Sequence, residues 1–154
     1  MVDLTKGPHM NAHESMSERV RRSVLAMPMA QTLKLAFRRI EPGHVELEMP
    51  VQDAWCFRPG QLQATAIFAA ADFAAMAAAG TLLPPGFINA TIDASLKLVA
   101  PARGSHLVAR GRVVKASRSL TVCAADVFAV SGEDETLCAT LLGTARNMEA
   151  AAAR

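Results

Sequence analysis

One stretch of the chain, residues 61–79, limits the possible folds more than any other, and it reads QLQATAIFAAADFAAMAAA. Almost every residue in it favours a helix, because Ala, Leu, Gln and Met lose little conformational freedom there. The stretch is apolar nearly all the way round, which is typical of a helix that other structure surrounds. We therefore predict a buried central helix that ends at Gly80, with Pro84 and Pro85 shortly beyond it.

Asp72 lies within this apolar stretch and is the only charged residue between Arg58 and Asp93. Carboxylates are rarely buried unless a partner or a function holds them there. One interpretation is that Asp72 lies on a solvated edge of the helix, in a stripe with Gln61 and Thr65. The other is that Asp72 is a functional carboxylate, and its isolation favours this second interpretation.

The composition limits the class of protein. With 154 residues, 51% of them hydrophobic and 19% charged, the chain is long enough for one folded domain with a proper core. A net charge of +2 is too small to indicate binding to nucleic acid or to an anionic membrane surface. We find no signal peptide and no metal-binding cysteine spacing, so we expect a cytoplasmic protein without a metal and with reduced cysteines (Cys56, Cys123 and Cys138).

The two ends of the chain differ from its middle. The first 15 residues are polar and without period, and they contain Gly7-Pro8-His9-Met10, which looks like a cloning remnant. We expect this segment to be a disordered tail, followed by one domain over residues 16–148 and a short Ala-rich tail over 149–154.

The domain is predicted to begin with an amphipathic helix that runs from Ser17, as N-cap, to about Met27. Its apolar edge should pack against the domain, while its arginines (Arg19, Arg21 and Arg22) face water. Alternation over residues 33–49 then predicts a hairpin with its turn at Pro42-Gly43.

After Gly86 the pattern is that of strands and turns only. In the first predicted strand, residues 88–98, Asn89, Thr91 and Asp93 should share one polar face, opposite an apolar face. Three more strands are predicted at residues 107–115, 120–130 and 136–146. A buried helix followed by such a meander is best covered by wrapping the sheet around it. This is the α+β hotdog fold, whose sheet has an edge that would pair with a second copy of the chain.

Two motifs carry a family resemblance that spans roughly residues 28–148. The segment Gly60-Gln61-Leu62-Gln63-Ala64-Thr65 precedes Asp72, which lies twelve residues after Gly60. The next predicted strand carries Thr91, then an acid two places later, and ends in Pro101-Ala102. In both features the chain resembles the hotdog thioesterases of the phenylacetate-pathway (PaaI-like) type. There the first motif is G-x-x-H-G-G followed by an acid, so Gln63 replaces His and Ala64-Thr65 replaces Gly-Gly.

The resemblance implies an acyl-CoA thioesterase that needs no cofactor, since coenzyme A is part of the substrate. Asp72 would then be the general base that activates water. Thr91 would hold that water, although a cross-strand hydroxyl without a catalytic role explains it equally well from spacing. Gln63 would offer its side-chain amide to the thioester oxygen, or else be an ordinary residue at the start of a helix.

The start of the central helix is a candidate oxyanion site. The free amides of Ala64 and Thr65, with the positive end of the helix dipole, suit a developing negative charge. Ala64 and Asp72 are eight residues apart, so about 12 Å along a helix axis. One carbonyl carbon cannot contact both. We therefore expect a homodimer, or a tetramer built of dimers, with each active site shared between two chains.

Other candidates concern the substrate. Gly60 and Gln61, at the helix entry, and Phe68, whose alanine neighbours leave room for an acyl chain or ring, are candidate substrate-binding residues. Arg118 is a weak candidate for the phosphates of coenzyme A. The alternative function is a catalytically silent hotdog module that binds acyl-CoA. A dehydratase or hydratase is less favoured, because no histidine lies near the central helix in sequence.

Overall fold

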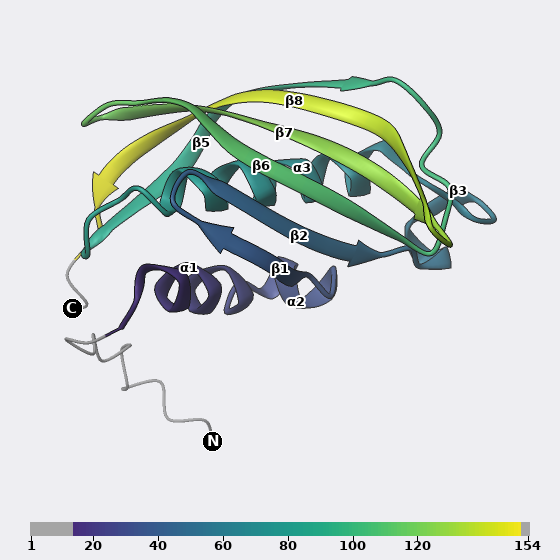
Figure 1. Ribbon diagram of the computed structural model, residues 1–154, viewed down its shortest axis with the longest axis horizontal. Helices are drawn as coiled ribbons and strands as arrows, with labels where there is room; N and C mark the ends of the chain where they lie inside the picture. Colours follow the sequence, from purple (N-terminus) through teal and green to yellow (C-terminus); the bar gives the residue numbers. More distant parts are fainter. Residues whose placement is uncertain (1–13, 152–154) are drawn as a thin grey trace.

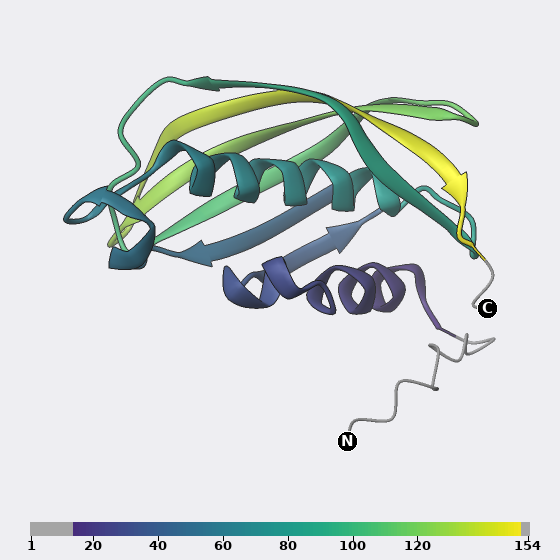
Figure 2. The same cartoon turned by 180° about the vertical axis from the view of Figure 1, so that it is seen from behind.

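The computed structural model describes residues 14–151, and it shows one sheet curved around one long helix (Figures 1 and 2). The helix is α3 (Ala64–Gly80). The large sheet has six antiparallel strands in the order β1-β2-β6-β7-β8-β5. Its strands are β1 (Ala36–Glu41), β2 (His44–Pro50), β5 (Phe87–Leu98), β6 (His106–Ala116), β7 (Leu120–Ser131) and β8 (Asp134–Glu149). This architecture confirms the predicted hotdog fold.

Helix α3 is covered by the sheet because nearly its whole surface is apolar. It contacts β2, β5, β6, β7 and β8, and its buried residues are almost all alanines. Small side chains allow the sheet to approach closely. At Gly111 of β6, a Cβ atom would lie 2.0 Å from the carbonyl oxygen of Ala74. A glycine is therefore required at this position of β6.

Two short helices precede the sheet, where one was predicted. Helix α1 (Met16–Leu25) begins at Ser15, which forms a capping box with Glu18, so the predicted N-cap Ser17 is wrong by two residues. Helix α2 (Pro28–Thr32) was not predicted. It lies between the predicted first helix and the expected hairpin, and β1 begins at Ala36. Figure 2 shows α1 and α2 lying on the open side of the sheet, below α3.

The entry to the central helix also differs from the prediction. Residues 61–62 form a short strand, β4 (Gln61–Leu62), which pairs with β3 (Cys56–Arg58) after a short 3-10 helix, η1 (Asp53–Trp55). The helix begins at Ala64 because Gln63 is its N-cap, and it includes Gly80, with Thr81 as C-cap. Propensity alone placed its start three residues too early.

The predicted polar face of β5 is wrong in one half of the strand. A β-bulge lies between Thr91 and Asp93. Before the bulge Asn89 and Thr91 turn toward α3, and after it Ala94 and Leu96 pack against the core. Because a bulge inserts one extra residue, it reverses the alternation. Thr91 and Asp93 therefore do not share a face.

The expected N-terminal tail lies mostly outside the described residues, as does the Gly7–Met10 segment, but Glu14 pairs with Arg22 of α1. At the other end, β8 extends to Glu149. Among the described residues, no helix combines the length and apolarity needed to cross a bilayer.

Candidate active site

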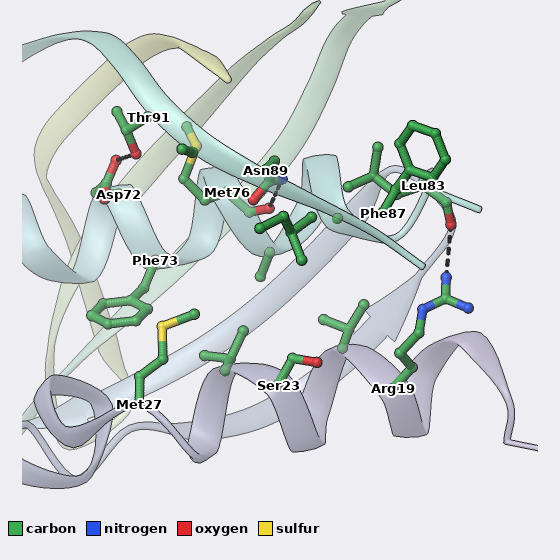
Figure 3. A pocket seen from close by; sticks show the side chains of 16 residues that line it. Arg19, Ser23, Met27, Asp72, Phe73, Met76, Leu83, Phe87, Asn89 and Thr91 are labelled. Atoms are coloured by element: carbon green, nitrogen blue, oxygen red, sulfur yellow. Dashed lines mark hydrogen bonds between the residues drawn. The ribbon is translucent and has the colours of Figure 1, made fainter. Parts of the chain in front are cut away.

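Asp72 and Thr91 form the centre of the candidate site (Figure 3). The Thr91 hydroxyl, on β5, donates a hydrogen bond of 3.0 Å to Oδ1 of Asp72, on α3. Asp72 is half-buried and Thr91 is exposed. The pair thus combines a carboxylate in an apolar helix with a hydroxyl that retains free lone pairs for a water molecule.

Burial raises the pKa of the Asp72 carboxyl above its ordinary value, and the hydrogen bond from Thr91 opposes that rise. The reason is that a carboxylate loses hydration among apolar side chains, while a donated hydrogen bond stabilises its charge. A carboxylate with a raised pKa is a stronger base than an exposed one. Asp72 therefore has the electrostatic character of a general base.

The start of α3 presents one free amide where two were predicted. The Gln63 side-chain oxygen accepts a hydrogen bond of 2.7 Å from the Thr65 amide, and the Thr65 hydroxyl donates to the same oxygen. The Ala64 amide meets no acceptor among residues 14–151. In this conformation Gln63 acts as a cap through its oxygen, which leaves its NH2 group and the Ala64 amide available.

Of the remaining predicted substrate residues, Phe68 lies one helical turn before Asp72 on α3, and the other three come from other segments. Gly60, with φ of 70°, forms the turn between β3 and β4, and Gln61 pairs with Arg58 and Arg103. Phe68 packs against the core. Arg118 lies in the β6–β7 turn, at the end of the sheet opposite the one where α3 begins (Figure 1).

A cavity of about 300 Å³ opens beside the Asp72–Thr91 pair, between α1, α3 and β5. Figure 3 shows Phe73 and Met27 near Asp72, with Arg19, Leu83 and Phe87 at the far end. Most of the lining is apolar, and the side chains that contribute polar atoms are Arg19, Ser23, Asp72, Asn89 and Thr91. A cavity of roughly 150 Å³ can hold benzene, so this one has room for a larger apolar group.

The wall contributed by α1 was missed by sequence reasoning. Arg19 was expected in water, but it is half-buried, lines the cavity and donates a hydrogen bond of 2.7 Å to the Leu83 carbonyl. The amphipathic pattern of α1 gave the only signal, since Val20 and Val24 are buried as expected. That pattern does not reveal which part of the domain the helix covers.

The two buried cysteines do not provide a reactive nucleophile beside this pair. Cys123 and Cys138 are buried, and burial raises the pKa of each thiol to about 11. Thiols of this kind are unreactive at neutral pH. Among residues 14–151, no group of His, Cys, Asp and Glu side chains is arranged to hold a metal ion.

The fold is that of the hotdog proteins, and part of the chain matches a thioesterase family model. The model of the Thioesterase superfamily matches residues 64–136, which include α3 and most of the sheet. No curated protein sequence matches the chain.

Among solved structures, the chain is similar to a thioesterase family protein from Silicibacter pomeroyi, with 29% identity, a TM-score of 0.85, and 88% of this chain and 100% of that one covered. The PaaI protein from the phenylacetic acid degradation operon of E. coli shares the fold at 13% identity, with a TM-score of 0.76 and 86% and 93% covered. A thioesterase from Haemophilus influenzae does so at 18% identity, with a TM-score of 0.76 and 88% and 92% covered. The predicted resemblance to PaaI-like thioesterases is confirmed, and thioesterase chemistry is supported in general terms.

Proposed function

We propose that this protein is an acyl-CoA thioesterase with Asp72 as general base. The observation that carries the proposal is the hydrogen bond between Thr91 and Asp72, at the mouth of a largely apolar cavity. A half-buried carboxylate beside a hydroxyl can orient and deprotonate a water molecule, and the cavity can hold the acyl group next to it.

The proposed reaction has two steps. Asp72 takes a proton from a water held by Thr91, and the water oxygen bonds to the thioester carbonyl carbon, whose π electrons move to the carbonyl oxygen. The tetrahedral oxyanion then collapses, the carbon–sulfur bond breaks, and the departing sulfur takes the proton from Asp72. The products are a carboxylic acid and coenzyme A, and no other co-reactant is needed.

Among the described residues, the candidate oxyanion donors at the start of α3 lie far from Asp72 of the same chain. The Ala64 amide is suitable, but it is about 12 Å away along α3. We therefore propose that the Ala64 amide of a second copy completes the site, aided by the Gln63 NH2 group and, after a side-chain rotation of Gln63, by the Thr65 amide.

The position of Thr91 supports a shared site. Strand β5 is an edge of the sheet and has 12 residues, with one row of backbone groups unpaired among the described residues. Such an edge is a template for pairing with another chain. A copy paired along β5 would lie next to Thr91 and Asp72, as a dimeric active site requires.

The other substrate roles are proposals of the same kind. We propose that Gly60, Gln61 and Phe68 contact the acyl-CoA and that Arg118 binds a coenzyme A phosphate from its exposed turn. Cytoplasmic localisation remains a proposal, which the free thiols of Cys123 and Cys138 support.

One observation favours the alternative of a silent acyl-CoA-binding module. The Gln63 side-chain oxygen accepts the hydrogen bond of the Thr65 amide, which the reaction would need as an oxyanion donor. If this cap is permanent, the oxyanion site has fewer donors, and binding without turnover would result.

One experiment separates the two functions. A panel of acyl-CoA esters is assayed for release of coenzyme A by the wild type, Asp72→Asn and the matched control Asp93→Asn, whose carboxylate is exposed. Loss of a general base should lower kcat by about 10²–10⁴-fold in Asp72→Asn only. Saturable binding without hydrolysis by the wild type would favour the silent module.

A further inference from the structure

The cavity beside Asp72 differs in chemistry along its length. Helices α1 and α3 both border it, and Figure 3 shows Met27 and Phe73 at the Asp72 end and Arg19 at the other. Asp72 and Gly80 both line it and are eight residues apart on α3, so the cavity extends over about 12 Å. A largely apolar cavity thus connects a carboxylate at one end to a guanidinium at the other, with Ser23 and Asn89 between them.

Arg19 has donors that the fold does not use. Its guanidinium carries five N–H groups, and among the described residues one nitrogen bonds to the Leu83 carbonyl, a neutral acceptor. Glu14, whose pKa is lowered by the hydrogen bond from Arg22 and further by the nearby charges of Arg22 and Arg19, is hydrogen-bonded to Arg22 at 2.7 and 2.9 Å and not to Arg19. Arg19 therefore lines the cavity as a cation without a carboxylate partner in the part of the chain that the structure describes.

A guanidinium in this position is suited to a carboxylate. Bonds between Arg and a carboxylate are charge-assisted, often two at a time, and about twice as strong as neutral hydrogen bonds. The half-buried surroundings of Arg19 reduce the screening by water that weakens exposed ion pairs. Ser23, one turn along α1, also lines the cavity and could donate to the same group.

We propose that the cavity selects acyl groups with an apolar chain and a carboxylate at the end remote from the thioester, which Arg19 binds. This inference rests on the proposed function, since the thioester carbonyl must lie at Asp72. The substrate class is then the mono-thioesters of medium-length dicarboxylic acids. Helix α1 is the specificity element, because it supplies both Arg19 and the apolar wall.

Binding is tested apart from turnover. Non-hydrolysable analogues of suberoyl-CoA and octanoyl-CoA, with a methylene in place of the thioester sulfur, are titrated by calorimetry. Both have eight acyl carbons and differ in the terminal carboxylate. The wild type should bind the suberoyl analogue roughly 10–100-fold more tightly. Arg19→Met should remove that preference and leave the octanoyl analogue bound equally well or better.

Two further variants make the test specific. Arg21→Met removes an arginine of the same helix that stacks on Phe37 at 5.5 Å and does not line the cavity, so the preference should persist. Ser23→Leu, at an exposed position of α1 that lines the cavity, should narrow the cavity and weaken the binding of both analogues.

The outcomes separate this inference from the proposed function. Hydrolysis of acyl-CoA with no preference between the two analogues, or equal loss of both in Arg19→Met, would overturn the inference and leave the thioesterase proposal intact. An Arg19-dependent preference for the suberoyl analogue, without hydrolysis of any thioester, would support the inference as a statement about binding. It would overturn the thioesterase proposal.

Discussion

The Thr91 hydroxyl lies 3.0 Å from Oδ1 of Asp72, although 19 residues separate the two in the chain. The contact depends on the bulge in β5, which turns Thr91 inward while keeping Ala94 and Leu96 in the core. Without the bulge, either Thr91 or the pair Ala94 and Leu96 would lie on the opposite face of the sheet. A local irregularity of the strand thus positions the proposed catalytic pair.

The pH dependence of the reaction should reflect this pair. Burial raises the pKa of Asp72. In a plot of kcat/KM against pH, the decline on the acid side (the acid limb) should therefore lie at a pH above the ordinary Asp value of 3.8. Thr91→Val removes the hydrogen bond that lowers this pKa, so its limb should move to still higher pH. Rate profiles of both proteins with one acyl-CoA ester check this, and an unchanged limb in Thr91→Val would contradict it.

Asp72 should also lower stability at neutral pH. Its folded-state pKa is raised, so the folded protein holds this proton more tightly than the unfolded chain does. The stability that the protonated Asp72 contributes is fully present below the pKa that Asp72 has in the unfolded chain. It is lost as the pH rises through the pKa that Asp72 has in the folded protein.

Asp72→Asn should therefore be the more stable protein at pH 7. The gain should be within about 1 kcal/mol, because a half-exposed carboxylate keeps much of its hydration. Urea unfolding at pH 7 and near pH 4 measures the difference, which should shrink at the lower pH. A loss of stability in Asp72→Asn at pH 7 would refute the prediction.

The oxyanion role of Ala64 can be tested with a substitution that removes its backbone N–H group. Ala64 is the first residue of α3, where proline is tolerated, and Gln63 has φ −72° and ψ 147°, which suits a residue before proline. Ala64→Pro deletes the amide N–H and should lower kcat by about 10²–10³-fold with little change in melting temperature. Ala64→Gly keeps the N–H and should stay active. Full activity of Ala64→Pro would exclude this amide.

The close approach of sheet and helix predicts a strong effect at Gly111. A Cβ there would lie 2.0 Å from the Ala74 carbonyl oxygen, and backbone atoms cannot move aside easily. Gly111→Ala should lower the free energy of unfolding by at least about 2 kcal/mol. Gly80→Ala, whose Cβ would meet only Asn89 Nδ2 at 3.8 Å, is the control and should change it by no more than about 0.5 kcal/mol. Chemical denaturation of both variants decides.

Much of the fold follows from patterns that are independent of tertiary context. The apolar stretch around Asp72 predicts a buried helix, and the alternation after Gly86 predicts the strands that cover it. What the patterns miss is local. Helix α2 has only five residues, too few to show a helical period, and the bulge near Ile92 leaves the alternation of residue types unbroken although it reverses the faces.

The candidate site was only partly predictable for a related reason. Asp72 stands out because it is a lone charge in an apolar stretch, and Thr91 follows from the motif. Arg19 does not stand out, since an arginine on an amphipathic helix usually faces water. Its place in the cavity depends on where α1 docks, and the spacing of residues within one helix carries no information about that.

The central claim is that Asp72 of one chain acts with the start of α3 of another. The most direct test is to co-express Asp72→Asn and Ala64→Pro with different affinity tags and assay thioester hydrolysis by the purified mixed dimers. In each mixed dimer one of the two sites has both groups intact, so activity should return to about half that of the wild type. Mixed dimers no more active than the two parent variants would contradict the shared site.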